Sequence, residues 1–286
     1  MRRASGTAAP RLLAVDLDGT LLDLRGQPHE RDVKALRALA ETGVPVSIVT
    51  GRLYSGTRAS AAALGLSGPV ACVDGSHMVS TATHTTLMHH GIKGDHSLKL
   101  RDALARSGPA TFLFARDAIV HDEAGEPFLS YVATWSQDVR RAVRVVEHEF
   151  WEDDDGLTAV VAVGTVDQIA SAVEEIQRTL PDAAQVAMFP IRRILGAWGL
   201  VVRAVGGNKG SALAWLANHH GCSMEETVVV GDWQNDVPMF KVAGRAFAMG
   251  QAPDDVKATA TDVLEETAEL GGGIARVVEE VFKIRF

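Results

Sequence analysis

Two acidic residues follow a short apolar run near the start of the chain. The sequence LLAVDLDGT places Asp16 and Asp18 directly after the apolar residues 12–15. In an extended segment, residues two positions apart share a direction, so both carboxylates are expected to face one site. Gly19 follows them and allows a turn that a side chain would obstruct. We therefore expect one site to hold both acids.

Polar residues also follow other apolar runs of the chain. Thr50, Gly51 and Arg52 follow the second apolar run in VPVSIVTGR, and Asp74, Gly75 and Ser76 follow the third in PVACVDGS. Gly231 and Asp232 follow a late run in TVVVGD. In open parallel sheets the ligand crevice lies beyond the carboxyl ends of the strands. These acids and hydroxyls are therefore expected to converge on the site of Asp16 and Asp18.

Three converging carboxylates indicate a metal site. Asp16, Asp18 and Asp232 would repel one another unless a cation joined them, and Mg²⁺ prefers oxygen ligands in octahedral geometry. Protein-bound Mg²⁺ is usually shared with a substrate phosphate, which favours phosphoryl chemistry. The Thr50 hydroxyl and the Lys209 ammonium, in GGNKGS at the start of a predicted helix, would complete a phosphate pocket.

The periodicity of the two chain ends predicts the elements that position these residues. Apolar runs alternate with helical stretches at both ends; the helical stretches are residues 30–42, 55–66, 209–221 and the start of 237–250. Such alternation is typical of a parallel sheet with crossover helices. We therefore predict an α/β fold with a Rossmann-like parallel-sheet core.

The middle of the chain has a different pattern, which predicts an inserted α+β domain. Its expected helices are residues 95–108 and 166–180, and its expected strands are residues 111–122, 157–164 and 186–202. The predicted domains are a discontinuous core, residues 1–89 and 205–286, and an insert, residues 90–204. A length of 286 residues agrees with two units, because single cores rarely grow to that size.

Composition and charge limit the classes of partner. With 47% hydrophobic and 22% charged residues, the chain is expected to be soluble and globular. A formal net charge of -8 argues against nucleic acid as a general partner. No apolar leader or membrane-spanning stretch is evident, so a cytoplasmic location is expected. Cys72 and Cys222 are predicted to be core thiols.

Four ordered motifs carry a resemblance to a known family. DLDGT, VTGR, Lys209 and GDWQND resemble the motifs of the haloacid dehalogenase-like hydrolase superfamily. The position of the insert resembles the Cof-type subgroup, which carries an α+β cap there and consists mostly of phosphatases acting on sugar phosphates or related metabolites. The resemblance covers the chain from about residue 11 onward, and its motifs specify the reaction far better than the substrate.

The resemblance implies a role for each acidic residue. Asp16 would be the nucleophile that forms an aspartyl phosphate, and Asp18 would protonate the leaving alkoxide and then activate water. Mg²⁺ would be held by Asp16, Asp232 and the Asp18 backbone carbonyl. Asp236 would complete the metal site by orienting metal-bound waters or Lys209. Asn235 would position the phosphoryl group.

The expected substrate contacts are Thr50, Gly51, Arg52, Lys209 and Asn235, with Thr50 and Lys209 also assisting catalysis. Alternatives remain for several of them: Thr50 as a helix cap, Lys209 as an exposed lysine at a helix start, and Arg52 as a structural partner of a carboxylate. In the insert, Arg192, Arg193 and Trp198 are candidates for substrate contact, although a basic surface and a buried tryptophan are the commoner roles.

Two positions depart from the family pattern. Asp74 stands where many relatives carry Asn before Gly, and GQAP, at residues 250–253, replaces a common NAP. Trp233, in GDWQND, is also bulky. Three functions stay open: a Mg²⁺-dependent phosphatase for a small phosphomonoester, a phosphomutase or phosphotransferase acting on sugar phosphates, and a non-catalytic regulator that binds a phosphorylated metabolite. Retention of both Asp16 and Asp18 favours chemistry.

Overall fold

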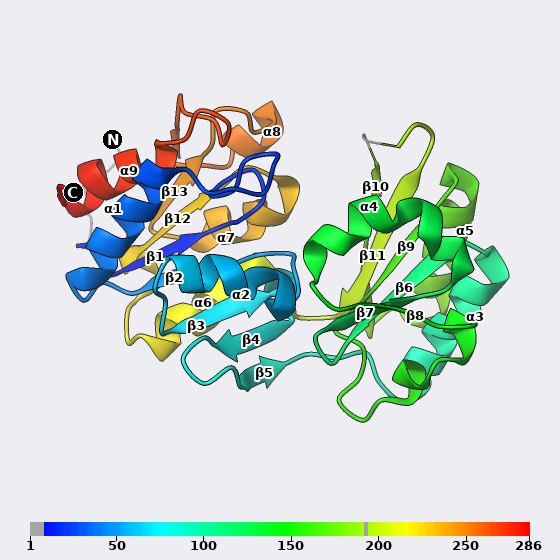
Figure 1. Ribbon diagram of the computed structural model, residues 1–286. Coiled ribbons are helices and arrows are strands. Elements are labelled where there is room, and N and C mark those ends of the chain that lie inside the picture. The colour runs from blue at the N-terminus through cyan, green and yellow to red at the C-terminus, as the bar shows by residue number, and fades with distance from the viewer. Residues whose placement is uncertain (1–8, 192–193) are drawn as a thin grey trace, which may run out of the picture. The chain divides into compact units, whose positions relative to one another are not determined.

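The computed structural model describes residues 9–191 and 194–286. The chain forms two compact units (Figure 1). The first unit contains the chain up to Gly51, Arg58–Leu87 and Asn208–Phe286, and the second contains Arg52–Thr57 and Met88–Gly207. None of the helices in the described parts of the chain combines the length and the apolar character needed to cross a membrane.

A five-stranded parallel sheet forms the centre of the first unit. Its strands, in spatial order, are β14 (Asp262–Val263), β13 (Arg245–Ala248), β12 (Thr227–Gly231), β1 (Leu12–Val15) and β2 (Val46–Ile48). The predicted α/β fold with a parallel core is therefore confirmed. The chain moves outward from β1 to β2 and in the other direction from β12 to β14, so the order reverses between β1 and β12.

Helices cover both faces of this sheet. They are α1 (Glu30–Glu41), α2 (Tyr54–Ala63), α6 (Lys209–His219), α7 (Val237–Val242), α8 (Asp254–Lys257) and α9 (Gly273–Val277), followed by a π-helical turn, Val278–Phe282. α1 packs on α9, and α6 packs on α7 (Figure 1). Because the crossovers through α1 and α7 run in opposite directions across the sheet, right-handed connections place these two helices on opposite faces.

The third apolar run forms a small sheet of its own beside β2. β3 (Pro69–Cys72) pairs antiparallel with β4 (His77–Ser80), and β5 (Thr86–His89) follows at the edge. A single parallel bridge, Val49 to Ala71, connects β3 to the end of β2. The predicted third strand therefore extends the parallel sheet through this one bridge only.

The second unit is built on a six-stranded mixed sheet. Its strands, in spatial order, are β10 (Ala184–Pro190), β11 (Trp198–Ala204), β9 (Ala159–Gly164), β6 (Ala110–Ala115), β7 (Ala118–His121) and β8 (Val139–Arg141). Its helices are α3 (Asp95–Ser107), α4 (Leu129–Val132) and α5 (Val166–Thr179). α3 and α5 pack together, and Leu100, Leu104 and Ile176 belong to the apolar core of this unit.

Two predicted strands of the insert are wrong in detail, because each is a hairpin. Residues 111–122 turn at Arg116 and Asp117, which both adopt positive φ, to give β6 and β7. Residues 186–202 give β10 and β11. The turn in the first hairpin contains no Gly, Asn or Pro, so the sequence carried no strong signal for it.

A buried carboxylate joins α1 to the chain end of the first unit. Asp32 is 2% exposed and accepts hydrogen bonds from the backbone N–H groups of Gly272 (2.8 Å) and Ala275 (2.7 Å) at the start of α9. Burial raises the pKa of Asp32, and these two hydrogen bonds act in the opposite direction. Asp32 thus supplies the acceptors that the first turn of α9 lacks.

Replacement of Asp32 with alanine is expected to destabilise the protein by about 2–4 kcal/mol, because two buried N–H groups lose their acceptor. Urea unfolding would measure the loss. Glu30→Ala on the same helix is the matched control: its carboxylate is largely exposed and pairs with Lys34, so the free energy of unfolding should hardly change. Equal effects of the two substitutions would show that Asp32 does not tie α1 to α9.

Candidate active site

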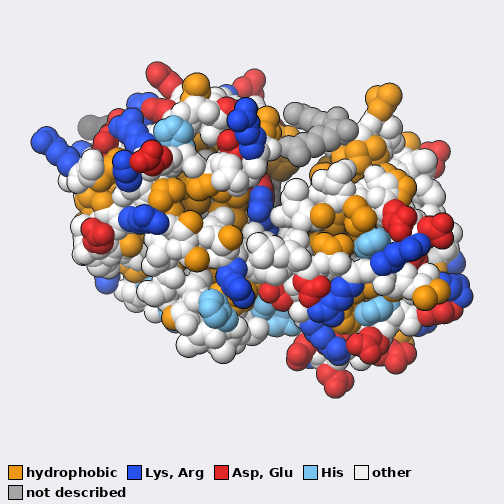
Figure 2. Space-filling view, viewed as in Figure 1, with side chains coloured by type: hydrophobic (Ala, Val, Ile, Leu, Met, Phe, Trp, Pro, Cys, Tyr) orange, Lys and Arg blue, Asp and Glu red, His pale blue; other side chains and the backbone are white. Residues whose placement is uncertain are grey.

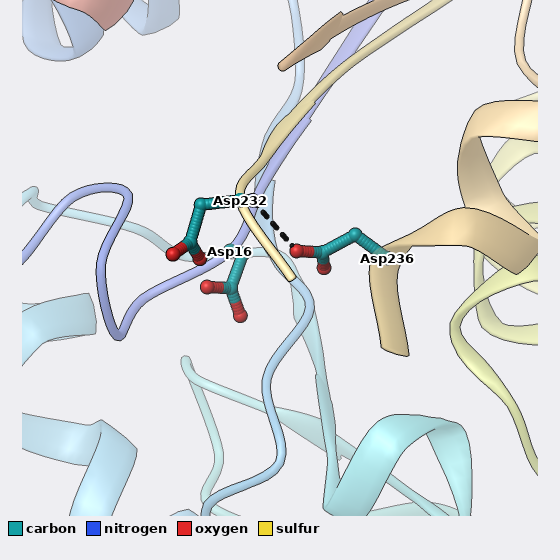
Figure 3. A group of neighbouring side chains, drawn as sticks. All are labelled: Asp16, Asp232 and Asp236. Carbon is teal, nitrogen blue, oxygen red and sulfur yellow. Dashed lines mark hydrogen bonds between the residues drawn. The ribbon is translucent and has the colours of Figure 1, made fainter. Parts of the chain in front are cut away.

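The ends of β1 and β12 bring two distant carboxylates together. These neighbouring strands are parallel, with Val15 opposite Val230, and the Asp16 N–H donates to the Val230 carbonyl (3.0 Å). Asp16 and Asp232 therefore leave the sheet at the same edge, where the strand order reverses and open α/β sheets bind ligands. Figure 3 shows their carboxylates next to one another.

Asp236 adds a third carboxylate to this pair. One oxygen of each of Asp16, Asp232 and Asp236 lies within 4.8 Å of the others. The three residues are 5%, 8% and 0% exposed, respectively. Three acids this deeply buried need positive charge nearby to be ionised together, since an unpaired carboxylate in the interior is very costly.

Lys209 supplies part of that charge. Its Nζ donates to Asp16 Oδ1 (2.5 Å) and to Asp236 Oδ1 (2.6 Å), and the residue is fully buried. It is the first residue of α6, whose start is fixed by Asn208, the N-cap that accepts from the N–H groups of Gly210 and Ser211. The alternative of an exposed lysine at a helix start is therefore wrong.

The second oxygen of Asp236 organises the loop after β12. Asp236 Oδ2 accepts hydrogen bonds from the backbone N–H groups of Asp232 (2.8 Å) and Trp233 (2.9 Å). Gly231 allows this close approach, because a Cβ at that position would lie 2.5 Å from Asp236 Cγ. Figure 3 shows Asp236 reaching this loop from the side opposite Asp16. With these bonds, Asp236 positions both Lys209 and the loop that carries Asp232.

The charges of the cluster do not balance. Burial, opposed by the Lys209 ammonium, raises the pKa of Asp16 well above its usual range. Burial and the charge of Asp236 raise the pKa of Asp232 to about 7. Burial lowers the pKa of Lys209, but the charges of Asp16 and Asp236 outweigh it and raise that pKa overall. Three carboxylates facing one ammonium fit a divalent cation, which would remove the excess negative charge.

Asp232 has the weakest hydrogen bonds of the three acids. The Thr20 hydroxyl and the Gln251 side-chain amide each lie 3.4 Å from one of its oxygens. Gln251 also donates to the Gly19 carbonyl (2.5 Å). Gly19 has φ +82°, and a Cβ there would lie 2.4 Å from Asp232 Oδ2. A side chain at position 19 would thus collide with this carboxylate, which explains the glycine in DLDGT.

The other predicted residues of the first motifs have different exposures. Asp18 is exposed, in contrast to Asp16. Thr50 is fully buried two residues after β2; its N–H donates to the Ala71 carbonyl (2.9 Å), and its carbonyl accepts from the Asp74 N–H (2.8 Å). Because α2 begins only at Tyr54, Thr50 is not the cap of that helix.

Asn235 lies against Asp74, a residue that was expected to converge on the site but was given no role there. The Asn235 side-chain amide donates to Asp74 Oδ1 (2.8 Å), and a Cβ on Gly51 would lie 3.5 Å from the same oxygen. Val73 and Asp74 both have positive φ, +47° and +52°. A β-branched residue in that region is strained, and such strain is concentrated at functional sites. The position of Asp74 directly after the third apolar run is the pattern that predicted its place near the site.

The remaining candidates belong to the second unit. The Arg52 guanidinium donates to the Gly56 carbonyl (3.3 Å), a contact within its own segment. Trp198 is half-buried and packs against the apolar core of the second unit. Arg192 and Arg193 lie outside the described residues.

The family model for haloacid dehalogenase-like hydrolases matches residues 13–278. The chain belongs to this family. Its motif order had predicted this membership, which is confirmed, as is the resemblance to Cof-type members. A solved HAD/COF-like hydrolase from Plasmodium vivax has a TM-score of 0.78 at 21% identity, with 98% of each chain covered. A haloacid dehalogenase-like hydrolase from Bacteroides thetaiotaomicron has a TM-score of 0.81 at 20% identity, over 96% of this chain and 100% of that one.

Curated relatives cover nearly the whole chain. The pyridoxal phosphate phosphatase YbhA of Escherichia coli is 29% identical, over 89% of this chain and 93% of its own length. The 5-amino-6-(5-phospho-D-ribitylamino)uracil phosphatase YcsE of Bacillus subtilis is 27% identical, over 94% of each. Phosphoglycolate phosphatases are also similar, among them one from Methanobrevibacter smithii that is 23% identical over 94% of this chain and 97% of its own length.

Proposed function

We propose that the chain is a Mg²⁺-dependent phosphatase that hydrolyses a small phosphomonoester through an aspartyl phosphate on Asp16. By homology it is a phosphoric monoester hydrolase, since the relatives named above are phosphatases. The observation that carries the proposal is the buried group of Asp16, Asp232 and Asp236 around the Lys209 ammonium.

Asp16 and Asp18 would divide the reaction into two displacements. An oxygen of Asp16 forms a bond to phosphorus while the bond to the ester oxygen breaks, and Asp18 gives that oxygen a proton. Asp18 then takes a proton from a water molecule that attacks phosphorus, which releases phosphate and restores Asp16. The exposure of Asp18 leaves its carboxyl accessible both to the leaving ester oxygen and to the attacking water.

The remaining residues would bind the phosphoryl group and the metal. Mg²⁺, when bound, would neutralise charge on the transferring phosphoryl group. The proposed metal ligands are Asp16, Asp232 and the Asp18 backbone carbonyl. Asp236 is proposed to complete the metal site by orienting metal-bound waters or Lys209. Lys209 is the proposed cation for the phosphoryl oxygens. The further substrate contacts that we propose are Thr50, Gly51, Arg52 and Asn235.

The substrate is proposed to be a sugar phosphate or a related metabolite. The named relatives act on chemically different phosphomonoesters, a pyridoxal phosphate, a ribitylaminouracil phosphate and phosphoglycolate, so only the phosphate ester is common to them. The net charge of -8 supports a small molecule rather than nucleic acid as the partner. On the face shown in Figure 2, acidic side chains are interspersed with basic ones among the described residues.

Phosphate release from a panel of phosphomonoesters tests this proposal. Sugar phosphates, pyridoxal 5′-phosphate, phosphoglycolate and a chromogenic aryl phosphate would be compared with Mg²⁺ and with a chelator. We expect Mg²⁺-dependent release of phosphate, with at least one metabolite preferred over the aryl phosphate. Formation of a new sugar phosphate without release would instead indicate a phosphotransferase or phosphomutase. No turnover of the panel, together with tight binding of one member, would indicate a regulator.

A further inference from the structure

A short segment directly after Thr50 belongs to the second unit. The chain passes from the first unit to the second between Gly51 and Arg52 and returns after Thr57, within α2. Within the second unit, the Leu53 N–H donates to the Trp135 carbonyl (2.9 Å). Gly56 packs so closely that a Cβ would lie 2.5 Å from the same carbonyl oxygen. The second unit therefore fixes the start of α2.

Asp117 makes the most specific of these contacts. It lies in the tight turn between β6 and β7, where its φ is +60°. Asp117 Oδ1 accepts from the Ser55 N–H (2.8 Å), and the Asp117 carbonyl accepts from the Ser55 hydroxyl (3.0 Å). The Ser55 hydroxyl also lies 2.8 Å from that of Ser136. Because Ser55 is the second residue of α2, the Asp117 carboxylate acts as a helix cap from a distant part of the chain.

The environment of Asp117 agrees with this capping role. Burial raises the pKa of its carboxyl, and hydrogen bonds from Ser55 and from the Tyr54 backbone act in the opposite direction. A partly buried carboxylate at a helix N-terminus has favourable interactions with the free N–H groups and with the helix dipole. These interactions offset part of the cost of burying the charge.

We infer that Asp117 is a positioning residue that sets the conformation of the chain between Thr50 and α2. This inference rests on the proposed function, in which Thr50, Gly51 and Arg52 contact the substrate. Thr50 is fixed on one side by its backbone hydrogen bonds to Ala71 and Asp74, and Ser55 is fixed on the other side by Asp117. Only four residues separate the Thr50 and Ser55 anchors, so loss of the cap frees one end of a segment directly next to the phosphate pocket.

Three variants test the role of Asp117. Asp117→Ala removes the acceptor, and Asp117→Asn keeps a side-chain oxygen that can accept the Ser55 N–H. Asp138→Ala is the matched control, because that carboxylate also lies in the second unit but pairs with Arg140. The readouts are amide hydrogen exchange of a peptide covering residues 49–57, kcat/KM for the preferred phosphomonoester, and the rise in melting temperature on addition of Mg²⁺.

We expect Asp117→Ala to increase exchange in residues 49–57 and to lower kcat/KM by about tenfold or more, since small misplacements of binding groups are costly. For Asp117→Asn, kcat/KM should stay within about threefold of the wild-type value. For Asp138→Ala, kcat/KM should equal the wild-type value. The Mg²⁺-induced rise in melting temperature should be unchanged, because the acidic cluster lies in the first unit.

Two results would overturn this inference. One is a folded Asp117→Ala variant with wild-type kcat/KM, which would leave Asp117 a purely structural cap. The other is unchanged exchange in residues 49–57, which is measured without any substrate. If the wild type hydrolyses no phosphomonoester, the proposed function fails, whereas the exchange experiment still decides whether Asp117 holds this segment.

Discussion

Replacement of Asp16 with asparagine is expected to lower kcat for phosphomonoester hydrolysis by at least about 10³-fold. An amide oxygen is a poor nucleophile toward phosphorus, so the first displacement loses its attacking group. The fold should survive, because burial and the neighbouring acids already disfavour a charge at position 16, and Lys209 keeps Asp236 as a partner. Phosphate release, measured with Mg²⁺ at saturating substrate, checks the loss.

Asp23→Asn is the matched control for this substitution. Asp23 lies on the loop after the same motif, where one of its oxygens accepts the backbone N–H groups of Arg25 and Gln27. Asparagine can accept the same hydrogen bonds, so near wild-type activity is expected. If Asp16→Asn released phosphate as fast as Asp23→Asn, Asp16 would not be the nucleophile.

Lys209→Met is expected to destabilise the protein by about 3–5 kcal/mol at neutral pH without Mg²⁺. Methionine nearly matches the size of the lysine stem but removes the cation between Asp16 and Asp236, which leaves buried carboxylates without compensation. In the folded variant, kcat should also fall by about 10²–10³-fold, because a cation for the phosphoryl oxygens is lost. Urea unfolding and phosphate release measure the two effects.

Two further variants separate charge from packing at Lys209. Lys241→Met, on the exposed side of α7, should leave stability nearly unchanged. The double variant Lys209→Met/Asp236→Asn should recover part of the lost stability, because one of the uncompensated charges is also removed. A double variant less stable than Lys209→Met alone would contradict the charge balance that we describe for this cluster.

The sequence was sufficient to predict the parallel core and the meeting of Asp16 with Asp232. Asp16 and Asp232 each follow an apolar run, and the ends of parallel strands share one edge, so local patterns predicted a contact between distant segments. The family membership that the motifs predicted was confirmed by the family model, which matches residues 13–278.

Other features depend on tertiary contacts that local patterns do not encode. The full burial of Lys209 requires two carboxylates from other segments, and a lysine at a helix start is usually exposed. Asp32 lies within a helical pattern as an ordinary polar residue, yet its partners are the N–H groups of α9. The β6–β7 turn depends on positive φ at two residues, neither of which is a glycine.

The most direct test of the account is the location of the covalent phosphate. The Asp18→Asn variant would be mixed with p-nitrophenyl phosphate and Mg²⁺, quenched in acid and reduced with borohydride, which converts an aspartyl phosphate to homoserine. Because p-nitrophenolate leaves without a proton, loss of Asp18 should slow the second displacement more than the first, and the acyl phosphate should accumulate. Peptide mass spectrometry is predicted to find homoserine at position 16. Release of p-nitrophenol with homoserine at another position of the chain, or with Asp16 unmodified, would contradict the assignment of Asp16 as the nucleophile.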